Sequence, residues 1–84
     1  MDFEIKFSKS ATKFLRSLDE CLLDRIKLKL KEVAKSPFRF LEHFEGKNYF
    51  KLRVGDFRAL IDVELERRIL FVRVFDKRGR IYKR

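Results

Sequence analysis

Two hydrophobic periods divide the chain. Over residues 2–7, apolar and charged side chains alternate, which is the period of a strand buried on one face. From residue 8 to residue 36, apolar positions recur every three or four residues, which predicts two amphipathic helices. Ser8-Lys9-Ser10 offers caps for the first helix, Asp19 restarts the pattern, and Ser36-Pro37 ends the second helix. The short join between the helices predicts a helix hairpin.

The second half of the chain returns to a period of two. Strand-like runs extend over Tyr49–Val54, Phe57–Glu64 and Ile69–Phe75. The connections between them, Gly55-Asp56 and residues 65–68, are short enough to force neighbouring strands to run antiparallel. These three runs therefore predict an antiparallel meander.

Two further segments complete the predicted order. Residues 37–47 have no clean period, so we interpret them as a connection, and Ile81-Tyr82 could add a last short strand. The order is β-α-α-β-β-β(-β), an α+β two-layer sandwich with the helix hairpin packed on a mainly antiparallel sheet. A chain of 84 residues has the size of one small domain, so we expect residues 1–84 to form a single domain.

Side-chain alternation assigns one face of this sheet to the helices and leaves the other face open. The side chains expected under the helices are Phe50, Leu52, Val54, Phe57, Ala59, Ile61, Val63, Leu70, Val72 and Val74. Those expected on the open face are Tyr49, Lys51, Arg53, Arg58, Leu60, Asp62, Ile69, Phe71, Arg73 and Phe75. We expect acidic residues to be nearly absent from the cationic part of the open face.

Positive charge gathers in the second half of the chain. The net charge is +9; residues 47–84 carry twelve Lys and Arg against five Asp and Glu, and residues 1–46 carry ten against eight. This favours a polyanionic partner, because cations that neutralise phosphates release counterions; the alternative is charge that keeps a small domain soluble. Cations with interleaved aromatic rings suit single-stranded nucleic acid. The residues that fit this description are Tyr49, Lys51, Arg53, Arg58, Arg73, Lys77, Arg78, Arg80 and Tyr82.

Several function classes lack their sequence signals. No run of about 18 apolar residues and no signal-peptide pattern is present, so we expect a cytoplasmic protein without a membrane span. Cys21 and His43 stand alone, which leaves no disulfide and no metal-ligand set, and we expect no metal and no cofactor. We interpret His43 as a loop residue. Any chemistry on the basic face would depend on cations and a phenol.

One stretch carries a family resemblance. YFKLRVGDFRALIDVE, with LEHFEG before it and ILFVRVFDKRGRIYKR after it, closely resembles the RelE/ParE superfamily of prokaryotic toxin–antitoxin toxins. Small members of that superfamily carry a Tyr-x-Lys/Arg-Leu-Arg-x-Gly-x-Tyr/Phe-Arg block. Its scaffold serves both RelE-like mRNA endonucleases and ParE-like inhibitors of DNA gyrase. The RelE branch implies metal-independent cleavage of mRNA on the ribosome and a RelB-like antitoxin, with a heterotetrameric toxin–antitoxin complex.

The resemblance also implies roles for single residues. The residues on the family's catalytic positions are Lys51, Arg58, Arg78 and Tyr82. RNA or ribosome binding then falls to Tyr49, Arg53, Arg73, Lys77, Arg80 and Lys83. Where the family usually has Val-Gly-His/Lys-Arg, this chain has Phe75-Asp76-Lys77-Arg78, so Asp76 brings a negative charge beside the expected site. ParE-like gyrase inhibition and a non-catalytic RNA- or ribosome-binding module therefore stay open as alternatives.

Overall fold

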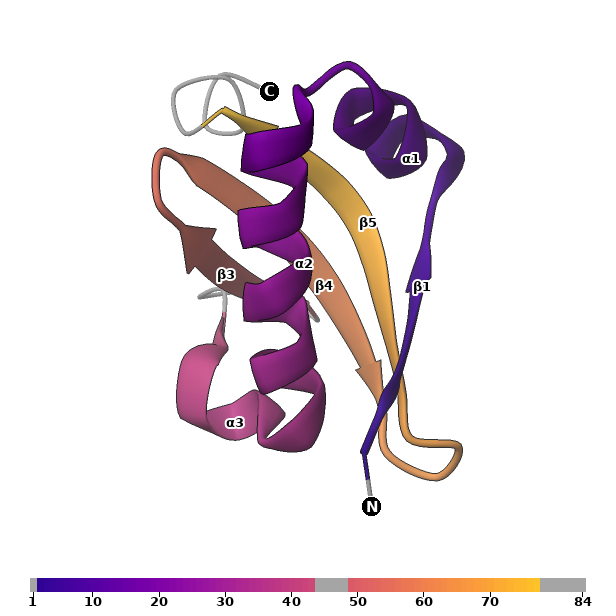
Figure 1. Cartoon of the computed structure of the whole chain (residues 1–84). Coiled ribbons are helices and arrows are strands. Elements are labelled where there is room, and N and C mark those ends of the chain that lie inside the picture. The colour runs from indigo at the N-terminus through magenta and orange to yellow at the C-terminus, as the bar shows by residue number, and fades with distance from the viewer. Residues whose placement is uncertain (1, 44–48, 78–84) are drawn as a thin grey trace.

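The computed structural model describes residues 2–43 and 49–77. In chain order the elements are β1 (Glu4–Phe7), α1 (Lys9–Arg16), α2 (Glu20–Lys35), α3 (Pro37–Phe40), β2 (Glu42–His43), β3 (Phe50–Val54), β4 (Phe57–Glu64) and β5 (Ile69–Lys77). Long helix α2 crosses one side of the sheet, and short helix α1 lies at one end of β1 and β5 (Figure 1). The predicted α+β class, with helices on a mainly antiparallel sheet, is confirmed.

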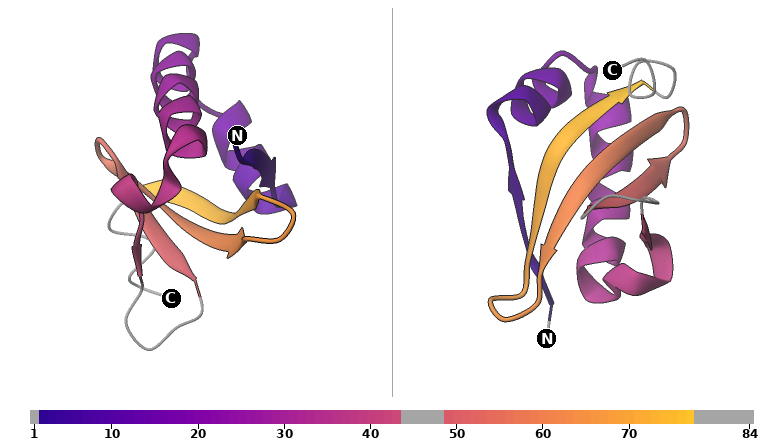
Figure 2. Two further views of the ribbon diagram at one scale, coloured as in Figure 1. Left: turned by 90° about the horizontal axis from the view of Figure 1, so that it is seen from below. Right: turned by 180° about the vertical axis from the view of Figure 1, so that it is seen from behind.

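The five strands form one open sheet in the order β1-β5-β4-β3-β2. Strands β3, β4 and β5 are the predicted antiparallel meander, whereas β1 joins the edge of β5 in parallel, after which the chain crosses over through the helices. The helices lie on one face of the sheet and leave the other face open (Figure 2). The interpretation of residues 37–47 as a plain connection was incomplete, because this segment contains α3 and β2.

The first helix begins at its predicted cap, and the second begins where Asp19 restarts the pattern. The Ser8 Oγ accepts a hydrogen bond from the Ala11 backbone N–H at 3.1 Å, and the Asp19 carboxylate accepts one from the Leu22 N–H at 2.9 Å. Each cap satisfies a backbone donor that has no partner inside its helix. The apolar stripes of the helices then pack on the sheet, and the largest fully buried side chains are Phe75, Ile26, Leu52, Ile61, Leu70, Val33 and Val72. No helix in the described ranges combines the length and apolar character needed to span a membrane.

A β-bulge in β5 changes the face of its last residues. Leu60 of β4 lies opposite Val74, but the next residue, Ile61, lies opposite Val72, so Arg73 is an extra residue in the ladder. The prediction that Val74 lies under the helices and Phe75 outside is therefore wrong. Phe75 is 2% exposed in the core, and Val74 shares the open face with Leu60. Simple alternation gave the wrong face because one inserted residue reverses the phase of every residue after it.

The bulge is fastened to the start of α1. The carbonyl oxygen of Arg73 accepts a hydrogen bond from the Ser8 hydroxyl at 2.6 Å and a longer one from the Ser10 hydroxyl at 3.3 Å. The Ser8 backbone N–H also donates to the Val72 carbonyl at 2.9 Å. A bulge leaves ladder groups to be satisfied elsewhere, and here the β1–α1 junction supplies the donors. Ser8 therefore caps a helix and holds the bulge at the same time.

Candidate functional site

The open face of β3, β4 and β5 gathers most of the predicted site residues that the structure describes. Lys51 and Arg53 come from β3, Arg58 from β4 and Arg73 from the bulge of β5; we call these four residues the cationic cluster. Tyr49, immediately before β3, lies beside them. None of the helices in the described ranges covers this face, as the view from behind shows (Figure 2, right). The described helices thus leave room for a large ligand over the cluster.

Lys51 is held between two neighbouring strands. It lies opposite Leu60 of β4 on one side and opposite Glu42 of β2 on the other. Its Nζ is 3.7 Å from the Glu42 Oε2, and 31% of its side chain is exposed. A partly exposed pair of this kind contributes little to stability. It does orient the Lys51 ammonium toward the open face, where it can meet a phosphate.

Arg58 lies in the middle of a charged row across three strands. Arg53 of β3 is directly opposite it on one side and Asp76 of β5 on the other. Arg58 is half-buried, and its Nε atom lies below the surface. Two like charges placed directly opposite each other on a sheet are destabilising. Local conflicts of this kind are often kept at functional sites, so the row is a candidate anion site.

Arg73 combines an ion pair with a ring contact. Its Nε is 3.6 Å from the Asp62 Oδ2, and its guanidinium carbon lies 5.4 Å from the centre of the Tyr49 ring. The stacking of a guanidinium on an aromatic ring is favourable and fixes both side chains. The structure therefore brings together Tyr49 and Arg73, two of the residues assigned to RNA or ribosome binding.

Carboxylates accompany these cations, which corrects one expectation. Glu42 pairs with Lys51, Asp62 pairs with Arg73, and Asp76 lies opposite Arg58. The expectation that acidic residues are nearly absent from this part of the face is thus wrong. Alternation placed Asp62 on this face and the resemblance placed Asp76 beside the site, but Glu42 arrives through β2, a strand that was not predicted. The net field of the cluster is weaker than its cations alone suggest.

The remaining predicted site residues fall elsewhere. Lys77 is exposed at the end of β5, but the register places it opposite Phe57, whose side chain faces the helices. The structure therefore does not bring Lys77 onto the open face with the cluster. The other predicted residues of this group lie outside the described residues: Arg78, Arg80, Tyr82 and Lys83.

Helix α2 adds two cations that sequence reasoning did not assign to the site. Arg25 and Lys29 line a hollow of about 540 Å³ together with Arg53 and the β3–β4 turn, over a floor that includes Ile26 and Phe57. Their spacing of four residues places them on one side of the helix, which is a readable signal. Tertiary packing decides which strand end lies against this side of α2. The sequence alone could therefore not place Arg25 and Lys29 beside Arg53.

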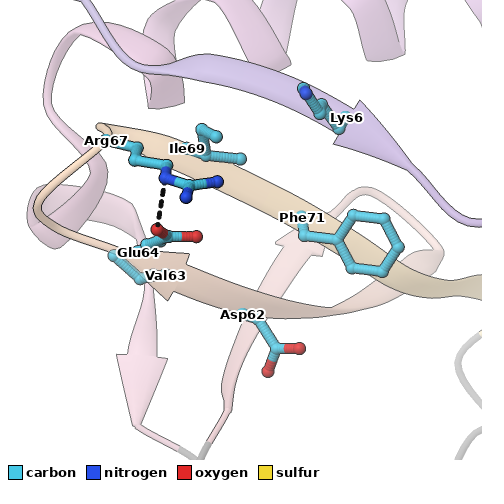
Figure 3. Close-up of a pocket in the computed structure, with 7 residues that line it drawn as sticks. All are labelled: Lys6, Asp62, Val63, Glu64, Arg67, Ile69 and Phe71. Atoms are coloured by element: carbon cyan, nitrogen blue, oxygen red, sulfur yellow. Dashed lines mark ion pairs between the residues drawn. The ribbon is translucent and has the colours of Figure 1, made fainter.

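The far end of the open face has a different character. A hollow of about 560 Å³ lies there, and Figure 3 shows the residues that line it: Lys6, Asp62, Val63, Glu64, Arg67, Ile69 and Phe71. Its two cations are balanced by two carboxylates, and the Arg67 Nε lies 3.3 Å from the Glu64 Oε1. Asp62 also pairs with Arg73, so this hollow and the cationic cluster share one carboxylate.

His43 has a structural role in the described part of the chain. It lies in β2 and not in a loop as expected, opposite Phe50, and the two rings pack edge to face with centres 5.2 Å apart. Within residues 2–43 and 49–77, no three His, Cys, Asp or Glu residues gather in a group that could hold a metal ion.

Comparison with models of known protein families shows which family this chain belongs to. The model of the ParE toxin of the type II toxin–antitoxin system parDE matches residues 5–81. The chain belongs to this toxin family. No curated protein matches it. The predicted membership of the RelE/ParE superfamily is thereby confirmed, and this family member is a toxin of a type II toxin–antitoxin system.

Solved structures agree with the family assignment. A chain of the toxin–antitoxin complex RelBE2 from Mycobacterium tuberculosis has the same fold, with a TM-score of 0.79 at 20% identity over 93% of this chain and 100% of that chain. The intact Escherichia coli RelBE complex matches with a TM-score of 0.75 at 25% identity over 89% and 95% of the two chains. The RelB–RelE complex from Methanococcus jannaschii matches with a TM-score of 0.71 at 26% identity over 93% and 95%.

Proposed function

We propose that this toxin is an endoribonuclease that cleaves ribosome-bound mRNA in the cytoplasm and so inhibits translation. The observation that carries the proposal is the cationic cluster on a sheet face that none of the described helices covers, with Tyr49 beside it. Such a face suits single-stranded RNA, because cations contact phosphates while an aromatic ring can stack on a base. Similarity to RelE structures at 25 to 26% identity supports the RelE branch.

The chemistry would use the RNA's own 2′-hydroxyl. The 2′-oxygen loses its proton and attacks the adjacent phosphorus, the bond from phosphorus to the 5′-oxygen breaks, and that oxygen takes up a proton. The products are a 2′,3′-cyclic phosphate and a free 5′-hydroxyl. The intermediate phosphorane carries extra negative charge, and fixed positive groups lower its energy.

We assign the stabilisation of the phosphorane to Arg58 and, from the resemblance, to Arg78. A guanidinium stays charged and can give two parallel hydrogen bonds to a phosphate. Lys51, whose ammonium is oriented by Glu42, contacts a phosphate oxygen. Tyr82 stacks on a base or exchanges a proton.

RNA and ribosome contacts go to residues around these four, namely Tyr49, Arg53, Arg73, Lys77, Arg80 and Lys83. The proposed site has no efficient general base. It would therefore depend on the ribosome to hold the 2′-oxygen in line with the phosphorus. Such orientation lowers the entropic part of the barrier.

The proposed partner in the resting cell is a RelB-like antitoxin. The solved neighbours from Escherichia coli and Methanococcus jannaschii are complexes of RelE with RelB. The net charge of +9 favours an acidic antitoxin segment, which would be held by complementary charge and would cover the cluster. We propose a heterotetramer of two toxins and two antitoxins.

A second candidate function is inhibition of DNA gyrase without cleavage. The matching family model is that of a ParE toxin, and the carboxylates of Glu42, Asp62 and Asp76 reduce the positive field that RNA cleavage would use. A non-catalytic RNA- or ribosome-binding module would bind through the same surface but would not stop growth.

Induction of the toxin without antitoxin separates these functions. Incorporation of labelled amino acids and of labelled thymidine is followed over the first minutes, and ribosome-bound mRNA is mapped by primer extension. The proposal predicts an early loss of amino-acid incorporation together with new 5′ ends within coding regions. A selective loss of thymidine incorporation would assign the chain to gyrase inhibition. Normal growth would assign it to the non-catalytic class.

A further inference from the structure

Arg73, the extra residue in the ladder between β4 and β5, is held at its backbone and at its guanidinium. Its carbonyl oxygen accepts hydrogen bonds from the Ser8 hydroxyl at 2.6 Å and from the Ser10 hydroxyl at 3.3 Å. Its Nε lies 3.6 Å from the Asp62 Oδ2, and its guanidinium carbon lies 5.4 Å from the centre of the Tyr49 ring. Bulges often re-aim a side chain beside a functional site, and this one aims Arg73 back across β4.

The strand registers explain how one arginine reaches both partners. The pairing of β4 with β5 makes Asp62 a diagonal neighbour of Arg73 on the open face, and diagonal neighbours lie within reach of long side chains. On the other side of β4, Ile61 lies opposite Phe50 of β3. One residue further, the same register brings Tyr49 to the level of Asp62. The side chain of Arg73 therefore extends from β5 across β4 to the start of β3.

The ion pair between Asp62 and Arg73 adds little to the stability of the fold. Their side chains are 45% and 49% exposed, and pairs this open to water contribute little to the free energy of folding. Asp62 also lines the far hollow, but its carboxylate points away from Lys6 and Arg67, the two cations there (Figure 3). What the pair does is restrict the rotamers of a long cationic side chain on the open face.

A restricted arginine binds RNA at a lower entropic cost than a freely rotating one. Ordering a long side chain at an interface lowers affinity by about two- to tenfold, and a side chain that is already ordered avoids this loss. The same carboxylate has an opposite effect, because a negative charge on the face weakens the field that attracts a polyanion. Orientation and field therefore predict affinity changes of opposite sign when the charge of Asp62 is removed.

We propose that Asp62 is a positioning residue for RNA binding. Its carboxylate keeps the Arg73 guanidinium on the Tyr49 ring, so that the three side chains form one preorganised contact for single-stranded RNA. The RNA contact rests on the proposed function, in which Tyr49 and Arg73 bind RNA. On this account the orienting effect of Asp62 outweighs the weakening of the positive field.

The test uses Asp62→Asn, which removes the charge and keeps the size of the side chain. Affinity is measured for a fluorescent single-stranded oligoribonucleotide and for ribosomes. The matched control is Glu64→Gln, the same loss of charge two residues further along β4, at a carboxylate that pairs with Arg67. Asp62→Asn should bind both probes about two- to tenfold more weakly, whereas Glu64→Gln should bind them equally or more tightly. Asp62→Glu keeps the charge and should bind like the unmodified chain.

A second measurement does not depend on RNA. NMR of the free chain gives the chemical shifts of the Arg73 δ-protons, which the ring current of Tyr49 displaces, and Tyr49→Leu gives the shifts without the ring. In Asp62→Asn these shifts should move toward those of Tyr49→Leu, and in Glu64→Gln they should stay in place. The urea midpoint of Asp62→Asn should equal that of the unmodified chain, because the pair contributes little to stability.

Unchanged or tighter binding of RNA by Asp62→Asn overturns the inference, since Asp62 would then act through the field alone. A loss of affinity in Glu64→Gln equal to that in Asp62→Asn overturns it as well, and so do unchanged Arg73 shifts in Asp62→Asn. If the unmodified chain binds neither RNA nor ribosomes, the proposed function fails and the RNA role of this contact fails with it. The NMR shifts still decide whether Asp62 holds Arg73 on the Tyr49 ring.

Discussion

Replacement of Phe75 by alanine should destabilise the toxin strongly, because the bulge turns this ring into the core. Phe75 is 2% exposed, and its ring centre lies 6.1 Å from those of Phe14 and Phe57. Truncation of a buried phenylalanine to alanine costs about 3–5 kcal/mol, which includes the loss of ring–ring contacts. Val74 is the matched control. It lies half-buried on the open face opposite Leu60, so Val74→Ala should cost about 1 kcal/mol or less.

Urea unfolding of the purified chains, followed by circular dichroism, measures both free energies. The midpoint for Phe75→Ala should fall by at least about 1 M urea relative to the unmodified chain, and the midpoint for Val74→Ala should move little. A strand without the bulge predicts the reverse order, with Val74 buried and Phe75 exposed. If Val74→Ala is the more destabilising change, the bulge is refuted, and so is the placement of Asp76 beside Arg58.

Three further outcomes are expected. Ser8→Ala removes a helix cap and the stronger donor to the Arg73 carbonyl, so it should cost about 2 kcal/mol in urea unfolding; a cost below about 0.5 kcal/mol would contradict the link between α1 and the bulge. Gly55→Ala should cost about 1 kcal/mol, because Gly55 has φ +58, which strains any residue with a Cβ. The added Cβ meets nothing within 4 Å, so no steric clash adds to this cost, and a stabilised variant would contradict the backbone argument. Arg73→Ala should weaken ribosome binding and lower its logarithmic salt dependence by about one, whereas Arg39→Ala should change neither; equal salt slopes would remove Arg73 from the RNA surface.

Much of the fold could be predicted because periods of hydrophobicity are local. Alternation placed Leu52, Ala59 and Ile61 under the helices, and all three are buried there. The cap at Ser8 was equally readable, since a short polar side chain before an apolar stripe is a local signal, and Asp19 marked the start of the second helix. Turn residues between strands predicted the antiparallel pairing for the same reason.

The errors concern features that depend on two segments at once. The bulge at Arg73 exists because β4 and β5 pair with different registers on its two sides, and no period in β5 alone reveals it. The pairing of Lys51 with Glu42 could not be predicted either, because Glu42 comes from an unpredicted strand. Asp76 was expected beside the site, but its register opposite Arg58 depends on the bulge. Alternation identified the cations of the site and Asp62, whereas Glu42 required the tertiary structure.

Ribosome-programmed mRNA cleavage by Arg58→Ala tests the central proposal most directly. The loss of one fixed donor to the phosphorane costs about 2–4 kcal/mol, so cleavage should fall roughly 10²- to 10³-fold while the chain stays folded. Arg39→Ala is the control, since this exposed arginine of α3 packs against Phe40, away from the cluster. Primer extension gives the cleavage rates, and ribosome affinity measured in parallel separates docking from chemistry. The account predicts a large loss for Arg58→Ala alone, and cleavage by Arg58→Ala at the rate of the unmodified toxin would contradict it.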